Sequence, residues 1–371
     1  MKRRVISLGA AACLLIAACG GSSNGASKQA DTATVQTDAP AVTSAPARKP
    51  VESEPALAEP TVTEPAVTEP TVDEPAGMAR EWGVFEPDSD CACADGSEFV
   101  LWERPADPNK VVLYFEGGGA CFTEESCDFE NGTYTSSIDI TEPPSDSGLF
   151  DATNPENPLA DHSIIYVPYC TGDVFLSDET TDYGDLVVRH NGFVNASAGL
   201  DLLLGNYPGA EQVAVTGASA GSVPTPLFAG LAADRCPDTT DIVSFGDSSG
   251  GYPDVGVINA TIGSLWGTTK NLPAWPVADG LTAEEYSIPG LYVLAGVGAD
   301  ELVTLIDATE ALGETSGIEI SAYVAPGSAH TIMRSPEVYD LEVEGVRLID
   351  WMTELFRGTS PADVHCVDCV G

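Results

Sequence analysis

Short apolar runs that alternate with helical stretches constrain the fold of this chain more than any other feature. The runs are rich in β-branched residues, which favours buried strands. They lie at 110–115, 163–167, 212–216, 241–245, 291–295 and 319–324, and helical stretches at 193–204 and 227–235 separate some of them. This alternation predicts an α/β domain in which helices flank a mostly parallel sheet. Ligands of such sheets bind at the carboxyl ends of the strands.

A serine between two glycines follows one of these strands. The segment GASAG at 217–221, with Ser219 at its centre, comes directly after the run at 212–216 and before a helical stretch. A nucleophile elbow requires this strand–turn–helix context, and it requires glycines because side chains there would collide with strand and helix. Pro224 and Pro226 predict that the first turn of the following helix is distorted or delayed.

Two other serines stand in the same Gly-x-Ser-x-Gly pattern, which is a weak motif in a chain with 37 glycines. Ser23 lies in an N-terminal segment that predicts no strand. Ser248 follows a strand, but Gly251 and Pro253 come next, so no helix is expected there. Ser219 is therefore the candidate nucleophile.

A nucleophilic serine needs a histidine as base and a carboxylate that orients this base. His330 follows the last predicted strand and Asp300 follows the strand before it, so both should lie beside Ser219 at the carboxyl edge of the sheet. The chain order Ser219, Asp300, His330 matches the α/β-hydrolase pattern. Asp247, one strand earlier, and Glu301 remain alternative acids.

The other three histidines fit the role of base less well. His162 precedes a strand, at the wrong end of the sheet. His190 lies upstream of the serine, and His365 lies among the cysteines near the C-terminus.

A glycine-rich segment follows the first predicted strand. The run at 110–115 leads directly into Glu116 and then into three glycines at 117–119. Backbone N–H groups of such a segment can approach a developing alkoxide, which indicates an oxyanion hole. A disulfide between Cys121 and Cys127 would stiffen the segment.

The N-terminus resembles a bacterial lipoprotein processing site. Lys2, Arg3 and Arg4 precede an apolar run, and small residues precede Cys19. This order predicts a signal peptide at 1–18, cleavage before Cys19 and lipid on the Cys19 sulfur. An ordinary cleaved signal with an incidental Cys19 is the alternative. We expect an exported protein on the outer face of the bacterial cell membrane, which it touches through the lipid anchor only.

Residues 19–78 predict a stalk that does not fold. A five-residue repeat at 51–75 places proline at every fifth position, which blocks helix and sheet, and its glutamates keep the segment solvated. The remainder, 79–371, is long enough to bury the core of one globular domain.

The chain is strongly acidic, with a formal net charge of −42. Three basic residues lie in the predicted signal, and the stalk holds nine acids against three bases, so 79–371 carries −39. Such a charge argues against nucleic acid and anionic membrane surfaces as partners. It resembles the charge of proteins adapted to high salt, where repulsion is screened, but a merely acidic exported protein would show it too.

Eight cysteines remain after the signal and Cys19 are set aside, and an even number in an exported chain indicates disulfides. Only the local pair Cys121 and Cys127 can be suggested from spacing. A four-thiolate zinc site built from Cys91, Cys93 and the pair at 366 and 369 is a weaker alternative.

A series of motifs, all in the same order, resembles the pectin acetylesterase and Notum family. They are CADGS (93–97), EGGGAC (116–121) with a cysteine six residues on, NP (154–155), VPYCTGD (167–173), TGASAG (216–221), ADE (299–301) and His330. The resemblance implies a serine carboxylesterase on an α/β-hydrolase-like fold. Members of this family remove O-acetyl groups from pectin or an O-linked fatty acyl group from a protein.

The resemblance also implies roles by position for a triad, a set of oxyanion donors and one disulfide. These are Ser219, Asp300 and His330; Gly118, Gly119 and Ala220; and Cys121 with Cys127. The sequence departs from plant relatives, which usually have Cys and Gly where it has Ala218 and Ser222. It also has small residues, Gly119 and Ala120, where some members carry bulky ones. These departures leave the predicted chemistry intact, but they bear on which acyl group the enzyme accepts.

These features together predict a surface-anchored serine esterase that works through an acyl-enzyme and needs no metal or cofactor. The expected substrate is an acylated polysaccharide or a small ester, with acetate as the acyl group. Pectin itself fits poorly, because this acidic domain would repel a polyanion unless salt screens the charge. One alternative is a long-chain deacylase in which 252–290, with Trp266 and Trp275, forms a lid. Another is a non-catalytic surface binding protein on a hydrolase scaffold.

Overall fold

The structure is a computed structural model. It describes residues 5–10, 81–87, 90–248, 263–273, 304, 306–308, 311, 319–327 and 329–366. All of these residues belong to one compact unit, formed by Met1–Leu15 and Gly77–Gly371. The stalk predicted at 19–78 lies outside the described residues. No helix among the residues described is long and apolar enough to cross a membrane.

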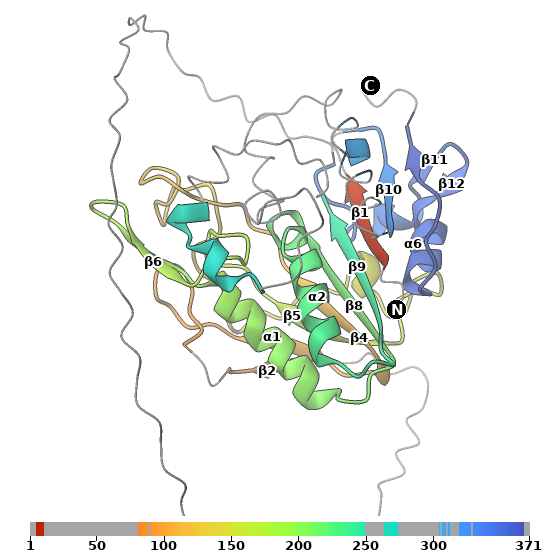
Figure 1. Ribbon diagram of the computed structural model, residues 1–371, viewed down its shortest axis with the longest axis horizontal. Helices are drawn as coiled ribbons and strands as arrows, with labels where there is room; N and C mark the ends of the chain where they lie inside the picture. Colours follow the sequence, from red (N-terminus) through yellow and green to blue (C-terminus); the bar gives the residue numbers. More distant parts are fainter. Residues whose placement is uncertain are drawn as a thin grey trace, which may run out of the picture. The chain divides into compact units, whose positions relative to one another are not determined.

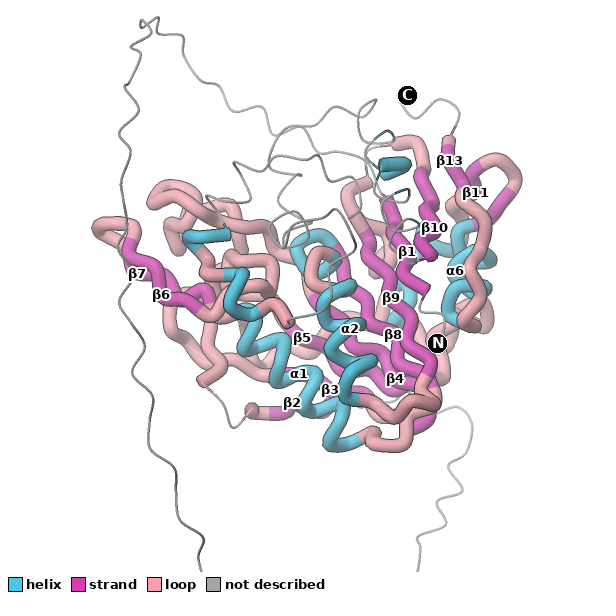
Figure 2. The backbone as a smooth tube through the Cα atoms, in the orientation of Figure 1, coloured by secondary structure: helices cyan, strands magenta, loops and turns pink. Residues whose placement is uncertain are grey.

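A sheet of nine strands forms the centre of the described structure (Figures 1 and 2). Its order is β13-β10-β1-β9-β8-β4-β5-β3-β2. The bounds are β1 Val5–Ala10, β2 Gly83–Phe85, β3 Leu101–Arg104, β4 Asp107–Phe115, β5 His162–Val167, β8 Gln212–Ala218, β9 Asp241–Asp247, β10 Glu319–Val324 and β13 Val364–His365. Strand β3 pairs antiparallel with β2 and β5, and the other pairs in this sheet are parallel. The predicted α/β-hydrolase-like fold with a mostly parallel sheet is confirmed.

Side chains alternate between the two faces of the sheet, as the pleat of a strand requires. On β4, Leu113 and Phe115 pack into the core beneath helices α1 and α2, while Val112 and Tyr114 pack into the core on the side of α6. The helix bounds are α1 Gly192–Asn206, α2 Thr225–Arg235 and α6 Leu348–Phe356. Helices α1 and α2 lie side by side in front of the sheet in Figure 1. Both faces are therefore covered, as a parallel sheet needs.

Most of the long predicted elements lie where the sequence places them. Strand β10 has the predicted bounds, and β4, β5, β8 and β9 extend the predicted runs by one to three residues. The strand predicted at 291–295 lies outside the described residues. Short elements had no sequence signal: β6 Glu179–Asp182, β7 Val187–His190, β11 Glu342–Val343, β12 Val346–Arg347 and the 3-10 turns η1 Gly148–Phe150, η2 Ser219–Ser222, η3 Thr268–Asn271 and η5 Pro336–Tyr339.

Strand β1 comes from the segment predicted to be a signal peptide. It pairs in parallel with β9 on one side and with β10 on the other. Cleavage before Cys19 would remove β1, so the processed chain would need another strand to join β9 to β10. Removal of 1–18 stays a prediction, and it requires that another strand take the place of β1 between β9 and β10.

Two disulfides join described residues. Cys121 pairs with Cys127, as predicted, and Cys93 pairs with Cys170. Cys366 is disulfide-bonded as well. The alternative zinc site is wrong because it would need the sulfur of Cys93, which the second disulfide uses.

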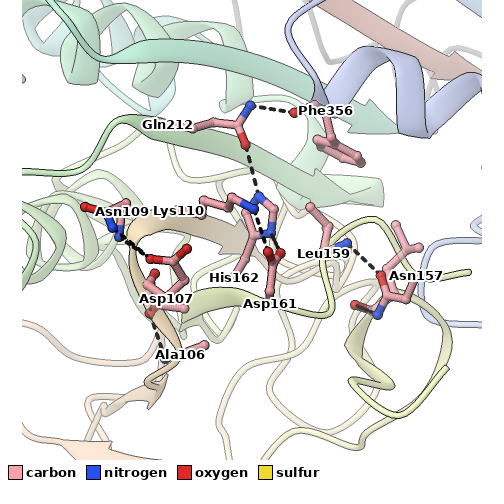
Figure 3. Close-up of polar contacts among 12 residues, drawn as sticks. Ala106, Asp107, Asn109, Lys110, Asn157, Leu159, Asp161, His162, Gln212 and Phe356 are labelled. Carbon is pink, nitrogen blue, oxygen red and sulfur yellow. Dashed lines mark hydrogen bonds and ion pairs between the residues drawn. The ribbon is translucent and has the colours of Figure 1, made fainter. Parts of the chain in front are cut away.

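The amino ends of β4, β5 and β8 are joined by a polar cluster around His162 (Figure 3). The ring of His162 lies between Asp161 Oδ1 at 3.0 Å and Gln212 Oε1 at 3.1 Å. Gln212 Nε2 donates to the carbonyl of Phe356, at the end of α6, and Lys110 forms an ion pair with Asp161. His162 is thus a structural residue at the edge opposite to Ser219, as its place before a strand predicted.

Burial lowers the pKa of His162, although its contacts with Gln212 and Asp161 act in the opposite direction. The folded state therefore takes up a proton at lower pH than the unfolded chain. By linkage, wild-type stability falls as the pH drops below the ordinary histidine value of 6.5.

His162→Ala should lower the free energy of unfolding by about 1–3 kcal/mol at pH 7, because it removes a buried, hydrogen-bonded ring. The difference between wild type and variant should shrink as the pH falls from 7 to 5. Urea unfolding at both pH values measures this. Esterase kcat should be unchanged, and a large loss of kcat in well-folded His162→Ala would contradict the structural role.

Candidate active site

Ser219 lies in a strained turn at the carboxyl end of β8. Its φ is +53°, a left-handed conformation that non-glycine residues rarely adopt. A Cβ on Gly217 would lie 2.1 Å from the Gly221 carbonyl oxygen, and a Cβ on Gly221 would lie 2.1 Å from the Phe115 carbonyl oxygen. The turn therefore has the geometry of a nucleophile elbow, and both glycines are required sterically.

The helix after the elbow is delayed, as the two prolines predict. A 3-10 turn, η2, covers Ser219–Ser222, and α2 begins only at Thr225 with Pro226 in its first turn. Ser222 Oγ donates to the Ser219 carbonyl, which satisfies one acceptor of the irregular turn.

His330 is the base that the structure brings to Ser219. Its Nε2 lies 2.7 Å from Ser219 Oγ, and it stands in the loop after β10, 111 positions along the chain. Burial lowers the pKa of His330, which favours the neutral ring that can accept the serine proton. The other histidines lie elsewhere: His190 contacts Tyr183 and Thr171, and His365 faces Asp307.

The predicted acid, Asp300, and the alternative Glu301 lie outside the described residues. The other alternative, Asp247, is described at the end of β9, and its side chain is almost fully buried. Its Oδ2 accepts hydrogen bonds from the backbone N–H groups of Ile332 at 2.8 Å and Met333 at 2.9 Å. Asp247 therefore binds the backbone of the loop that carries His330. Among the described residues, none hydrogen-bonds to Nδ1 of the His330 ring.

The glycine segment after β4 lies against the nucleophile. A Cβ on Gly117 would lie 2.9 Å from Ser219 Cβ, and Gly119 has a φ of +78°. Ala220 is in the first turn of η2, so its N–H has no partner within that turn. Within the described residues, no group accepts a hydrogen bond from the N–H of Gly118 or Gly119. These N–H groups are available to an oxyanion, which fits their predicted role.

The glycine segment is fixed at both ends. At its far end Cys121 forms the disulfide with Cys127, and its carbonyl accepts a hydrogen bond from Trp266 Nε1 at 3.2 Å. At its near end Glu116 Oε1 lies 3.2 Å from Arg334 Nη1. Arg334 follows His330 by four positions, so this ion pair joins the loop of the base to the segment of the oxyanion donors.

Arg334 makes two further contacts in this region. Its Nη1 donates to the hydroxyl of Tyr166 at 2.8 Å, and its Nη2 donates to Ser145 Oγ at 3.1 Å. Sequence reasoning missed Glu116 and Arg334 as partners because they are 218 positions apart and lie in no motif that links them.

Ser248, the second serine that follows a strand, is also held in the left-handed region, with a φ of +76°. Its hydroxyl is buried and has no hydrogen-bond partner in the part of the chain that the structure describes. Because it does not contact His330, it lacks the base that a nucleophile needs. The geometry therefore favours Ser219 over Ser248 as the nucleophile, as the sequence context does.

One group of described residues has the spacing of metal ligands: Cys121, Cys127 and His190, whose ligand atoms lie within 4.8 Å of one another. The two sulfurs are joined in a disulfide, so neither is a thiolate, which is the form that binds metal. His190 Nδ1 also lies 2.8 Å from the Thr171 carbonyl oxygen. This arrangement suits a structural cluster.

Comparison with known proteins places these residues in context. The family model "Pectinacetylesterase" matches residues 84–262, which include Ser219 and the glycine segment. Among solved structures, the Wnt deacylase Notum from Drosophila has a TM-score of 0.56 at 15% sequence identity. The match covers 78% of this chain and 97% of that chain. No curated protein matches the sequence.

Ser219→Ala should lower kcat for a small p-nitrophenyl ester by at least about 10³-fold, because it removes the nucleophile. Ser248→Ala is the matched control, since it truncates a buried serine of the same backbone conformation, and it should keep kcat near wild type. Steady-state kinetics of both variants measures this. Equal losses in the two variants would contradict the assignment of Ser219.

A second prediction concerns the acidic limb of the kcat/KM profile, which reports the pKa of His330 in the free enzyme. Burial lowers this pKa, and a carboxylate at Nδ1 would raise it again. Asp300→Asn should therefore move the limb to lower pH and reduce kcat, whereas Glu301→Gln should do neither. If Glu301→Gln shifts the limb and Asp300→Asn does not, the acid has been assigned to the wrong residue.

Proposed function

Because the chain belongs to the pectin acetylesterase and Notum family and is a carboxylic ester hydrolase, we propose that it removes short O-acyl groups, acetate above all, from a saccharide. The observation that carries this proposal is the 2.7 Å contact between Ser219 Oγ and His330 Nε2, beside N–H groups of Gly118 and Gly119 that have no acceptor among the described residues. The site thus combines a nucleophile, a base and oxyanion donors in one place.

The reaction follows from these positions. His330 accepts the proton of Ser219 as Oγ attacks the ester carbonyl, and the N–H groups of Gly118, Gly119 and Ala220 stabilise the oxyanion. The protonated ring then gives its proton to the leaving alcohol, and an acyl-enzyme remains on Ser219. Water, activated by the same ring, attacks the acyl group and releases the acid, so one ester and one water yield one alcohol and one acid. Asp300 would hold the ring through Nδ1.

Two observations favour a short acyl group. The matching family model is described as an acetylesterase family. In addition, Trp266, one of the two tryptophans suggested for an apolar lid, is fully buried, and its indole donates to the carbonyl of Cys121. It therefore fills the core beneath the glycine segment and cannot form the surface of a lid. Trp275 lies outside the described residues.

A long-chain deacylase is the second candidate. The solved Notum structure is titled a Wnt deacylase, and it has the same fold as this chain at 15% identity. The two candidates share the nucleophile and the base and differ only in the size of the acyl group. A non-catalytic binding protein is the third candidate, and the intact contact between Ser219 and His330 argues against it.

Attachment to the membrane is part of the same proposal. A lipid on Cys19 would hold the domain at the cell surface through the acidic stalk, where a neutral acylated polysaccharide meets no charge repulsion. Mass spectrometry of the protein extracted from membranes tests this. A diacylated or triacylated N-terminal Cys19 supports anchoring, and an intact Met1 rules out processing and keeps β1 in the sheet.

Hydrolysis of p-nitrophenyl esters with acyl chains of two to sixteen carbons should show the highest kcat/KM for acetate, with Ser219→Ala inactive on all of them. The full chain should be assayed at low salt and at molar salt, because screening lowers the repulsion within a domain of charge −39.

The outcomes separate the three candidates. A maximum at long chains would replace the acetylesterase by the deacylase. A folded protein that hydrolyses none of the esters and does not react with a fluorophosphonate would support the binding protein.

A further inference from the structure

We propose that Asp247 is a positioning residue for the esterase reaction, holding the His330 loop in register with Ser219 through the backbone of Ile332 and Met333. The inference rests on the proposed function, since it assumes that His330 is the base. It assigns to Asp247 a role different from that of the triad acid, for which the sequence left it as an alternative.

The backbone of Asp247 is fixed directly beside the nucleophile. Strands β8 and β9 pair in parallel, and Asp247 is the register partner of Ala218, the residue before Ser219. The carboxylate therefore starts from the strand next to the elbow. Any group that it binds is placed relative to Ser219 by the ladder of hydrogen bonds between the two strands.

The carboxylate binds the base loop at two adjacent points. Asp247 Oδ2 accepts the N–H of Ile332 at 2.8 Å and the N–H of Met333 at 2.9 Å. Asp247 is 2% exposed and Met333 is 1% exposed, so the bond to Met333 is shielded from water, and the bond to half-buried Ile332 is partly shielded. Hydrogen bonds to a carboxylate are stronger than neutral ones, and more so away from water.

The same stretch of loop is held from other directions. The Met333 carbonyl accepts the N–H of Leu149 at 2.8 Å, and Thr216 Oγ1 lies 3.3 Å from Met333 Sδ. Arg334 pairs with Glu116, as described above. His330 stands only two residues before the first of these anchors, so a short piece of chain transmits the position of Ile332 to the imidazole. Among these contacts, Asp247 is the one that binds the loop from β9, the strand next to the one that leads into Ser219.

Geometry separates this role from that of a triad acid. A triad acid binds Nδ1 of the histidine and stabilises the imidazolium through its charge, so an Asn in its place is severely impaired. Asp247 instead uses one oxygen to accept two backbone N–H groups. An Asn side chain offers a carbonyl oxygen at the same place, although it lacks the charge and carries an NH2 group instead of the second oxygen.

The test compares Asp247→Asn with Asp247→Ala in the full chain, with p-nitrophenyl acetate as substrate. Active sites are titrated with a fluorophosphonate, so that kcat is expressed per reactive Ser219. Asp247→Asn should stay within about tenfold of wild-type kcat, because the acceptor remains. Asp247→Ala should lose about 10- to 100-fold in kcat with little change in KM, which is the scale expected for a misplaced catalytic group.

Each other outcome overturns the inference. If Asp247→Ala keeps the wild-type kcat per titrated site and is only less stable, the role is structural. If Asp247→Asn loses about 10⁴-fold, Asp247 is the triad acid. Should Asp247→Ala fail to fold, Asp247→Ser replaces it, since its shorter side chain does not reach both N–H groups. Failure of the proposed function gives a different result, because the wild type would then react with neither ester nor fluorophosphonate.

Discussion

The parallel pairing of β8 with β4 on one side and β9 on the other is the constraint on which the site depends. Parallel strands end at the same edge of a sheet. This pairing therefore brings together the glycine segment after β4, the elbow after β8 and Asp247 at the end of β9. The approach is so close that the Phe115 carbonyl leaves no room for a Cβ on Gly221. The strain at Ser219 is a consequence of this packing, and it exposes Oγ at the edge of the sheet.

The base reaches this edge from the far side of the sheet, and it needs separate support. His330 stands in a loop, and loops are more mobile than strands. Polar contacts tie the residues just after it to the two strands beside β8. Buried Asp247 binds Ile332 from β9, and half-buried Glu116, directly after β4, binds Arg334. The base and the oxyanion donors are thus fixed to one framework. Preorganisation of this kind lowers the cost of reaching the transition state.

Much of the fold and of the site could be predicted from the sequence, since both depend on local patterns. The long buried strands have continuous apolar runs, and the elbow has glycines whose spacing follows from a steric collision. His330 could be found because it follows a strand at the correct edge. The pair Cys121 and Cys127 could be suggested because the two residues are close in sequence.

The rest depends on contacts between distant residues that no periodicity encodes. The disulfide of Cys93 with Cys170 is one of many pairings that the spacings allow. The ion pair of Glu116 with Arg334 and the contacts of Asp247 appear only once the sheet has assembled. Strand β1 was unexpected because a basic start followed by an apolar run also describes an export signal. The most direct test of the whole account is to label the native protein with a fluorophosphonate and map the modified peptide by mass spectrometry. The account predicts a single label on Ser219 that disappears in His330→Ala, whereas a label on Ser248, or ester hydrolysis without any label, would contradict it.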